Sequence, residues 1–439
     1  MEQLLTLVWM VLQTLPLFLV HPLFWLVVLL VFFQYRRVIE IEKQLFGTAK
    51  NNIWEQTALS MLTGLGGGLF ASILLLLFGL SLDRIAISWL WPIALLLLMI
   101  HPRLLCFSYA GGIIGLLSLI MRLAAPYFPQ LETSFLKGLL DISLPGLLFL
   151  IAVLHLTEAL LIFFSGHWGN SPIFIKTPQG EVVAGFSLQR FWPLPIMGLV
   201  AIIVPEASEM LQGSVPMPEW WPLFQSTLEP GSAEKLLYLM FPVVAGLGYG
   251  DLAVSSKPRD KCLYTARNLA IYSIILLMLS LLSEFYPLFV LPGVLFAPLA
   301  HEYVVYLGNK GELSSKPYYS FPDQGVRVLD VFPGTPADKA GLKSNDLILR
   351  VQGAHIDSAA GFWTLLREYF IYFHSLYLEV LRDERILILT LPKQSLLRFR
   401  QEVFGLILVP EPYSKKYVEM KKSLFPQILK RLFKGLRKP

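Results

Sequence analysis

The sequence predicts a polytopic α-helical membrane domain of about seven to nine spans, followed by a small α+β domain and a basic amphipathic tail. Of the 439 residues, 55% are hydrophobic and only 15% are charged, whereas a soluble domain carries about a quarter charged residues. Long apolar stretches fill the chain up to about residue 308, and lysine and arginine dominate its end. We therefore divide the chain into a membrane domain (1–308), a linker (309–323), the α+β domain (324–412) and the tail (413–439).

The first apolar stretch covers residues 4–33 and predicts a retained transmembrane helix. It is too long for the apolar part of a signal peptide, and it has neither a basic start nor a small-residue cleavage site. Pro16 and Pro22 lie within it and are expected to kink the helix or shorten the spanning part.

Eight further apolar stretches bring the expected number of spans to nine, with seven or eight left open. Several are shorter than the roughly 18 residues that define a clear span. The eight stretches are 58–80, 85–100, 104–121, 142–164, 191–204, 236–254, 269–282 and 285–299. A glycine-rich run, residues 64–68, lies inside the first of them; without a following Lys-Ser/Thr it predicts close helix packing, not phosphate binding.

The loop charges predict the orientation of the chain, because cytoplasmic loops carry an excess of lysine and arginine. With nine spans and the N-terminus outside, the α+β domain lies in the cytoplasm. The expected inner loops hold Arg36, Arg37, Lys43, Lys50, Arg103, Lys176, Arg190, Lys257, Arg259, Lys261 and Arg267. The expected outer loops hold only Arg84, Arg122, Lys137 and Lys235, and five glutamates lie between residues 206 and 234.

The run from Gly325 to Gly353 predicts a strand, a short helix and a second strand. Valines near period two predict the first strand, and Pro333-Gly-Thr-Pro336 ends it. Ser358 is expected to cap a helix over 359–370, and two more strands follow at 376–381 and 385–391. This order and the proline-glycine-alanine-glycine spacing resemble a bacterial-type PDZ domain; another small α+β domain is the alternative.

PDZ domains bind a peptide as an added strand beside a helix, often through an aromatic-Gly-apolar loop. No such loop precedes the first strand, and the best match follows the last one. The predicted groove walls are Phe404, Gly405, Leu406 and Ile407 on one side and Phe362, Leu365 and Leu366 on the helix. A plain closing strand at 404–409 remains equally open, as does binding of an internal segment instead of a carboxyl terminus. A Gly405→Trp change is expected to fill the groove and leave the domain folded.

The tail predicts a basic amphipathic helix that lies on anionic lipid. Its apolar residues recur at helical spacing, and Lys430, Arg431, Lys434 and Arg437 lie off that face. A solvated or protein-bound tail is the alternative. Nucleic acid is not expected, because the tail's aromatic residues belong to its apolar face.

The residues predict no catalytic site, no metal and no cofactor. Intramembrane zinc proteases need His-Glu-x-x-His, and the chain has His301-Glu302 with Val305 in place of the second histidine. His155 and Glu158 lie one turn apart but are expected to hydrogen-bond each other, since no third ligand is visible. Cys106 and Cys262 are expected to be reduced structural cysteines.

The whole layout resembles the MinJ-type cell-division topology proteins of Gram-positive, spore-forming bacteria. The resemblance rests on His21-Pro-Leu-Phe24 in the first span, a basic inner loop, many spans and the run Asp330–Pro336. It implies a non-enzymatic, septal and polar membrane adaptor that bridges a DivIVA-like coiled-coil scaffold to the division inhibitor MinD and, through MinD, to MinC. The alternative is a degenerate intramembrane protease, or a protease regulator, that presents substrates through its PDZ-like domain.

Overall fold

The N-terminal part of the chain is a helical bundle with membrane-spanning proportions. The computed structural model describes residues 2–85, 87–133, 136–177, 180–392 and 404–418, to which every structural statement here refers. Six helical segments are long and apolar enough to cross a membrane, and two shorter apolar helices accompany them. The six are α2 (Pro22–Phe46), α3 (Ile53–Phe78), α5 (Phe107–Ala124), α7 (Leu144–Ser165), α8 (Pro258–Phe285) and the segment Pro287–Glu312, most of which is α9 (Val290–Ser314). The polytopic helical domain is thus confirmed.

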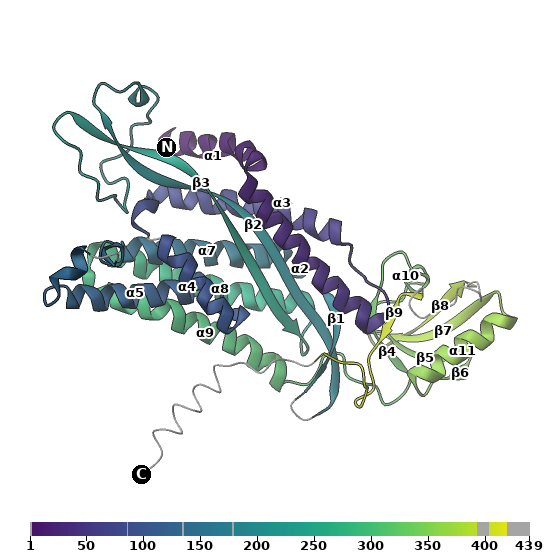
Figure 1. Cartoon of the computed structure of the whole chain (residues 1–439). Helices are drawn as coiled ribbons and strands as arrows, with labels where there is room; N and C mark the ends of the chain where they lie inside the picture. The colour runs from purple at the N-terminus through teal and green to yellow at the C-terminus, as the bar shows by residue number, and fades with distance from the viewer. Residues whose placement is uncertain (1, 86, 134–135, 178–179, 393–403, 419–439) are drawn as a thin grey trace, which may run out of the picture.

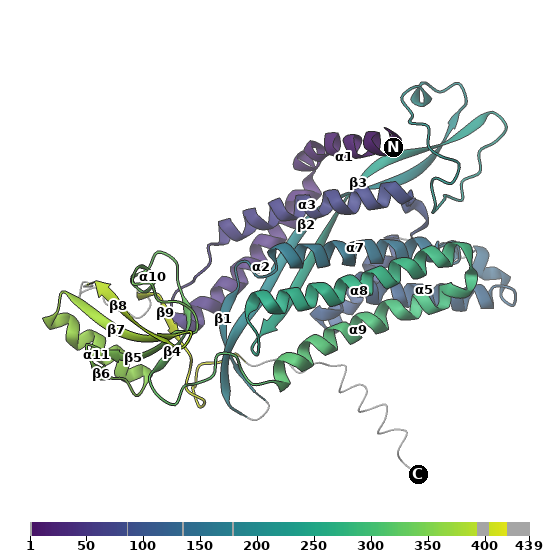
Figure 2. The same cartoon turned by 180° about the vertical axis from the view of Figure 1, so that it is seen from behind.

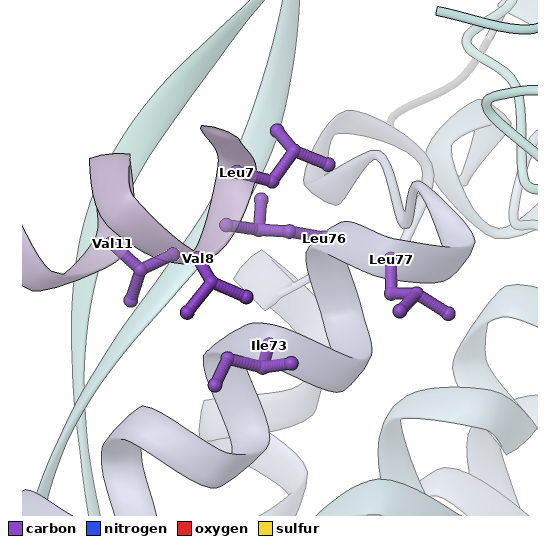
Figure 3. Close-up of a pocket in the computed structure, with 6 residues that line it drawn as sticks. All are labelled: Leu7, Val8, Val11, Ile73, Leu76 and Leu77. Atoms are coloured by element: carbon purple, nitrogen blue, oxygen red, sulfur yellow. The ribbon is translucent and has the colours of Figure 1, made fainter. Parts of the chain in front are cut away.

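The shorter helices are α1 (Glu2–Val20) and α4 (Ile87–Ile100). The predicted first span is therefore two helices. His21 is extended, its side chain accepts a hydrogen bond from the Leu23 amide, and Pro22 takes the first position of α2, where a missing N–H costs nothing. Leu7, Val8 and Val11 of α1 face Ile73, Leu76 and Leu77 of α3 across a small apolar hollow (Figure 3).

Two of the predicted spans are wrong: residues 191–204 and 236–254 form strands. They belong to β2 (Val182–Pro205) and β3 (Glu234–Ala253), which pair antiparallel from Phe186 to Pro205 of β2. Strand β1 (Ser171–Lys176) pairs with the start of β2 on its other edge. Figure 1 shows this long hairpin running beside the helices. Apolar content cannot distinguish a buried strand from a helix. Pro193 and Pro195 were the available signal, since both would interrupt a helix.

Helix α3 covers the edge of β2 that β3 leaves unpaired. An added Cβ at Gly64 would lie 2.3 Å from the Pro193 carbonyl oxygen, and one at Gly68 would lie 2.1 Å from that of Pro195. The glycine run thus packs closely as predicted: Gly64 and Gly68 lie against a strand, and Gly67 lies against helix α7, where an added Cβ would be 2.8 Å from Leu161 Cδ1. The two prolines have no N–H, so this edge needs fewer donors satisfied inside the membrane.

Two other donors of this edge are bonded to side chains of neighbouring helices. The Met197 amide donates to Ser72 Oγ at 2.8 Å, and the Phe191 amide donates to the Tyr35 hydroxyl at 3.3 Å. An isolated hairpin would expose unpaired backbone groups to lipid at considerable cost. At these two positions α2 and α3 supply to β2 what a neighbouring strand would supply.

Helices α4 and α5 form a hairpin that reaches only about halfway along the bundle. Cys106, at the start of α5, contacts His155 near the middle of α7, and Ser108 donates to the Ala297 carbonyl in α9. At its other end α5 contacts the segment before α7, where Arg122 donates to the Leu140 carbonyl. Arg103, predicted in an inner loop, lies at the hairpin turn and pairs with Glu302.

The two ends of the molecule carry different parts of the chain. The N-terminus lies beside the loop that joins β2 and β3, where Gln3 donates to the Pro216 carbonyl, and the C-terminal domain lies at the opposite end (Figures 1 and 2). Each of the two hairpins, α4–α5 and β2–β3, starts and finishes at the same end of the helical bundle. Neither hairpin therefore changes the end of the bundle at which the C-terminal domain lies.

The C-terminal domain has the predicted order of strands and helices. Its sheet runs β8-β7-β5-β4-β9, with β6 paired to β5. The elements are β4 (Val326–Val331), α10 (Pro336–Lys339), β5 (Leu347–Val351), β6 (Ala354–His355), α11 (Ala359–Tyr372), β7 (Ser375–Arg382), β8 (Arg385–Pro392) and β9 (Leu406–Leu408). Ser358 caps α11 through the Gly361 amide, as expected. The predicted linker is shorter than expected, because α9 continues to Ser314.

Candidate functional site

The structure places most of the predicted groove residues in one cluster between β9 and α11. Phe362 and Leu366 are fully buried, Leu365 is partly buried beside them, and Leu406 packs in the same core. The buried Phe404 ring stands perpendicular to that of Trp363, with centroids 5.5 Å apart. Within segment 404–409, residues 406–408 form strand β9, and Phe404 just before it contacts α11.

Strand β9 offers one free edge among the described strands. It pairs antiparallel with β4, which places it at the end of the sheet order, next to α11 in the core. An edge strand beside a helix is the geometry in which PDZ domains accept an added strand. Ile407 is the exception among the predicted residues, because it packs into the cluster of the membrane domain.

The expectation that Gly405→Trp leaves the domain folded is wrong. Gly405 has a φ of 73°, which side-chain-bearing residues rarely adopt, and an added Cβ would lie 2.3 Å from Thr335 Oγ1. The Gly405 carbonyl also accepts a hydrogen bond from the Phe332 amide. This position is a tight backbone crossing, so a change there tests folding and not peptide binding.

The C-terminal domain is docked on the membrane domain. Lys50, in the loop between α2 and α3, forms an ion pair of 2.7 Å with Asp330 at the end of β4. Burial raises the pKa of Asp330, and the Lys50 ammonium partly opposes that shift. The Tyr319 and Phe186 rings pack edge-to-face, with centroids 5.4 Å apart, and Phe186 belongs to β2. The apolar cluster of the membrane domain includes Leu329, Phe332, Ile407 and Val409.

A cleft of about 480 Å³ opens at this junction. Five basic side chains line it with three carboxylates. The basic residues are Lys50, Lys257, Arg259, Lys343 and Arg382, and the acidic ones are Asp330, Asp346 and Asp383. Sequence reasoning missed this cleft because its lining comes from segments more than 300 residues apart.

A second cluster lies inside the bundle and joins residues that the sequence treated separately. Cys106, His155 and His301 place their ligand atoms within 4.8 Å of one another. His155 does not hydrogen-bond Glu158 through its Nδ1, which contacts the Ile151 carbonyl at 2.7 Å instead. Thiolate and imidazole are ligands for zinc and copper.

The predicted tail residues, Lys430, Arg431, Lys434 and Arg437, lie outside the described residues. Lipid binding by the tail therefore stays a prediction from its sequence.

The fold defines a class: a polytopic membrane protein with a C-terminal PDZ domain. Residues 305–392 match the PDZ domain family model. A 40-residue segment is 48% identical to the Tax1-binding protein 3 homolog of Caenorhabditis elegans, covering 9% of this chain and 32% of that protein.

Within this class the chain is similar to one cell-division protein over most of its length. It is 24% identical over 360 residues to the cell division topological determinant MinJ of Bacillus subtilis (strain 168), covering 81% of this chain and 85% of that protein. No solved structure is significantly similar to the chain.

Proposed function

We propose that this protein is a membrane-anchored, non-enzymatic adaptor that bridges a polar DivIVA-like scaffold to MinD and, through MinD, to MinC. The observation that carries the proposal is the similarity to a division topological determinant over 81% of the chain, with the PDZ domain at its C-terminal end. Confinement to a membrane raises the local concentration of weak binding modules, so modest affinities suffice.

The proposed adaptor function requires the PDZ domain to lie in the cytoplasm, where MinD and the DivIVA-like scaffold are. The charges of the two ends support this orientation. Lysines and arginines around α2–α3, β1 and the start of α8 lie at the PDZ end, whereas the loop between β2 and β3 at the opposite end is rich in glutamate. The basic tail then meets the anionic inner leaflet, where each cationic residue contributes about 1 kcal/mol.

Reporter fusions test the orientation directly. A fusion after Pro439 should give a cytoplasmic signal, and one inserted at Gln225 should give an extracytoplasmic signal. The physical reason is the preference of positively charged loops for the cytoplasmic side. An extracytoplasmic signal after Pro439 would contradict the adaptor.

The groove between β9 and α11 is the proposed partner site, and Leu365→Lys tests it. Leu365 is partly buried at the helix wall, so a lysine there places a charge where a bound strand would pack. We expect affinity for at least one of the DivIVA-like scaffold and MinD to fall by tenfold or more, about 1.4 kcal/mol. Pull-down and titration with the full-length protein in detergent measure it.

Ile371→Lys is the matched control. It introduces the same charge on the same helix at a side chain that is 54% exposed and away from the groove. In cells, a fluorescent fusion of the unchanged chain and of the control should collect at septa and poles, while Leu365→Lys should spread around the membrane. Unchanged binding and localisation of a folded Leu365→Lys protein would show that the groove is unused.

A further inference from the structure

Three potential metal ligands converge from three separate elements in the bundle. Cys106 caps the N-terminus of α5, His155 lies in the middle of α7, and His301 lies in α9 (Figure 1 shows the three helices together). The Cys106 sulfur lies 3.1 Å from His155 Nε2 and 3.9 Å from His301 Nε2. His155 is 3% exposed, and all three ligand atoms lie within 4.8 Å of one another.

These separations fit a zinc ion between the ligands. Zinc binds sulfur at about 2.3 Å and imidazole nitrogen at about 2.0–2.1 Å, and a tetrahedral angle then separates sulfur and nitrogen by about 3.6 Å. The two observed sulfur–nitrogen distances lie on either side of that value. The sulfur therefore lies close to the separation that a shared zinc ion requires from each nitrogen, and all three atoms lie within 4.8 Å of one another.

The hydrogen bonds of His155 leave the correct nitrogen free for a metal. Its Nδ1 lies 2.7 Å from the Ile151 carbonyl oxygen, which only accepts, so Nδ1 carries the proton. The lone pair is then on Nε2, the nitrogen that faces Cys106. Metal-binding histidines use their second nitrogen in this way to hold the ring.

A chain of three groups selects the same tautomer for His301. Glu302 accepts from both Arg103 and the Tyr109 hydroxyl, each at 2.6 Å. The Tyr109 hydroxyl donates its single hydrogen to this carboxylate, so its oxygen accepts from His301 Nδ1, 3.3 Å away. The lone pair of His301 is left on Nε2, which also faces Cys106.

Two nitrogen lone pairs therefore face one sulfur, and a thiol has a single proton to share. The thiol hydrogen can bond to one histidine nitrogen, which leaves the lone pair of the other nitrogen facing the sulfur. A metal cation binds the lone pairs of all three atoms. The Ser108 amide at the start of α5 donates toward the same sulfur at 3.4 Å and helps to orient it.

We propose that Cys106 Sγ, His155 Nε2 and His301 Nε2 bind one Zn²⁺, with the fourth position open to water. The Cys106 thiol loses its proton to solvent on binding. The ion would cross-link α5, α7 and α9 and hold the α4–α5 hairpin in the bundle. This assignment reverses the expectation of no metal, which rested on the broken His-Glu-x-x-His run within one helix.

Metal analysis of the full-length protein in detergent tests the proposal. Protein exposed to Zn²⁺ and dialysed against a weak chelator should retain one zinc per chain. Cys106→Ser, His155→Asn and His301→Asn should each lose most of it. Cys262→Ser, which changes the other cysteine, and His374→Asn, which changes an exposed histidine, should retain it.

Cobalt substitution gives a spectroscopic readout that the unchanged protein alone can already contradict. Co²⁺ in the unchanged protein should produce a thiolate-to-cobalt charge-transfer band, because a sulfur ligand is present. The band should persist in Cys262→Ser and vanish in folded Cys106→Ser. Folded, unchanged protein without zinc above the level of the variants, without the sulfur band, or with Cu⁺ bound in place of zinc would overturn the assignment.

Discussion

Gly68→Ala is expected to abolish accumulation of the folded protein, although it adds a single methyl group. The new Cβ would lie 2.1 Å from the Pro195 carbonyl oxygen and 2.9 Å from Pro195 Cδ, and the first of these is rigid backbone. Separating α3 from β2 would also stretch the Met197–Ser72 hydrogen bond next to the contact. Overpacking commonly costs about 1–3 kcal/mol, and displacing a paired strand raises that cost.

Gly66→Ala is the matched control on the same helix. A Cβ at Gly66 meets nothing within 4 Å. Alanine also favours a helix over glycine by about 1 kcal/mol, so this variant should equal or exceed the parent in stability. The yield of monodisperse protein and its thermal unfolding in detergent are measured for Gly68→Ala and for Gly66→Ala. Equal behaviour of the two variants would refute close packing between α3 and β2.

Lys50→Met is expected to weaken docking of the PDZ domain by roughly 3–5 kcal/mol, the usual cost of leaving one partner of a buried ion pair alone. The Lys50 and Asp330 side chains are only 18% and 10% exposed, so solvent screens them little. The double variant Lys50→Met with Asp330→Leu removes both charges and should recover most of the loss. Hydrogen exchange in β4 and thermal unfolding, each measured for the parent, for Lys50→Met and for the double variant, test both expectations.

The pH dependence of Lys50→Met has a definite sign. Asp330 already has a raised pKa because it is buried, and losing the ammonium removes the group that opposes this shift. The folded state then binds a proton more tightly than the unfolded state, so stability falls as pH rises through the folded pKa. The deficit should be large at neutral pH and shrink on acidification. A deficit that grows on acidification would mean that the carboxylate is not the cause.

The sequence by itself determined the class of the membrane domain and the order of the PDZ elements. Both depend on local chemistry. Low charge content excludes a soluble fold over the first 300 residues. Pro333-Gly-Thr-Pro336 stops β4 and starts α10, and Ser358 starts α11 through its own side chain.

Only the tertiary structure decided which apolar segments are strands, where the PDZ domain sits and which side chains meet. Residues 191–204 and 236–254 are as apolar as helices, and they become strands because Gly64, Gly68 and Ser72 give β2 an edge on which to pack. Lys50 meets Asp330, and Cys106 meets His155 and His301, across separations that no local pattern spans. Burial and polar pairing in three dimensions decide such contacts, because the free energy of a buried charge or lone pair depends on its spatial neighbours.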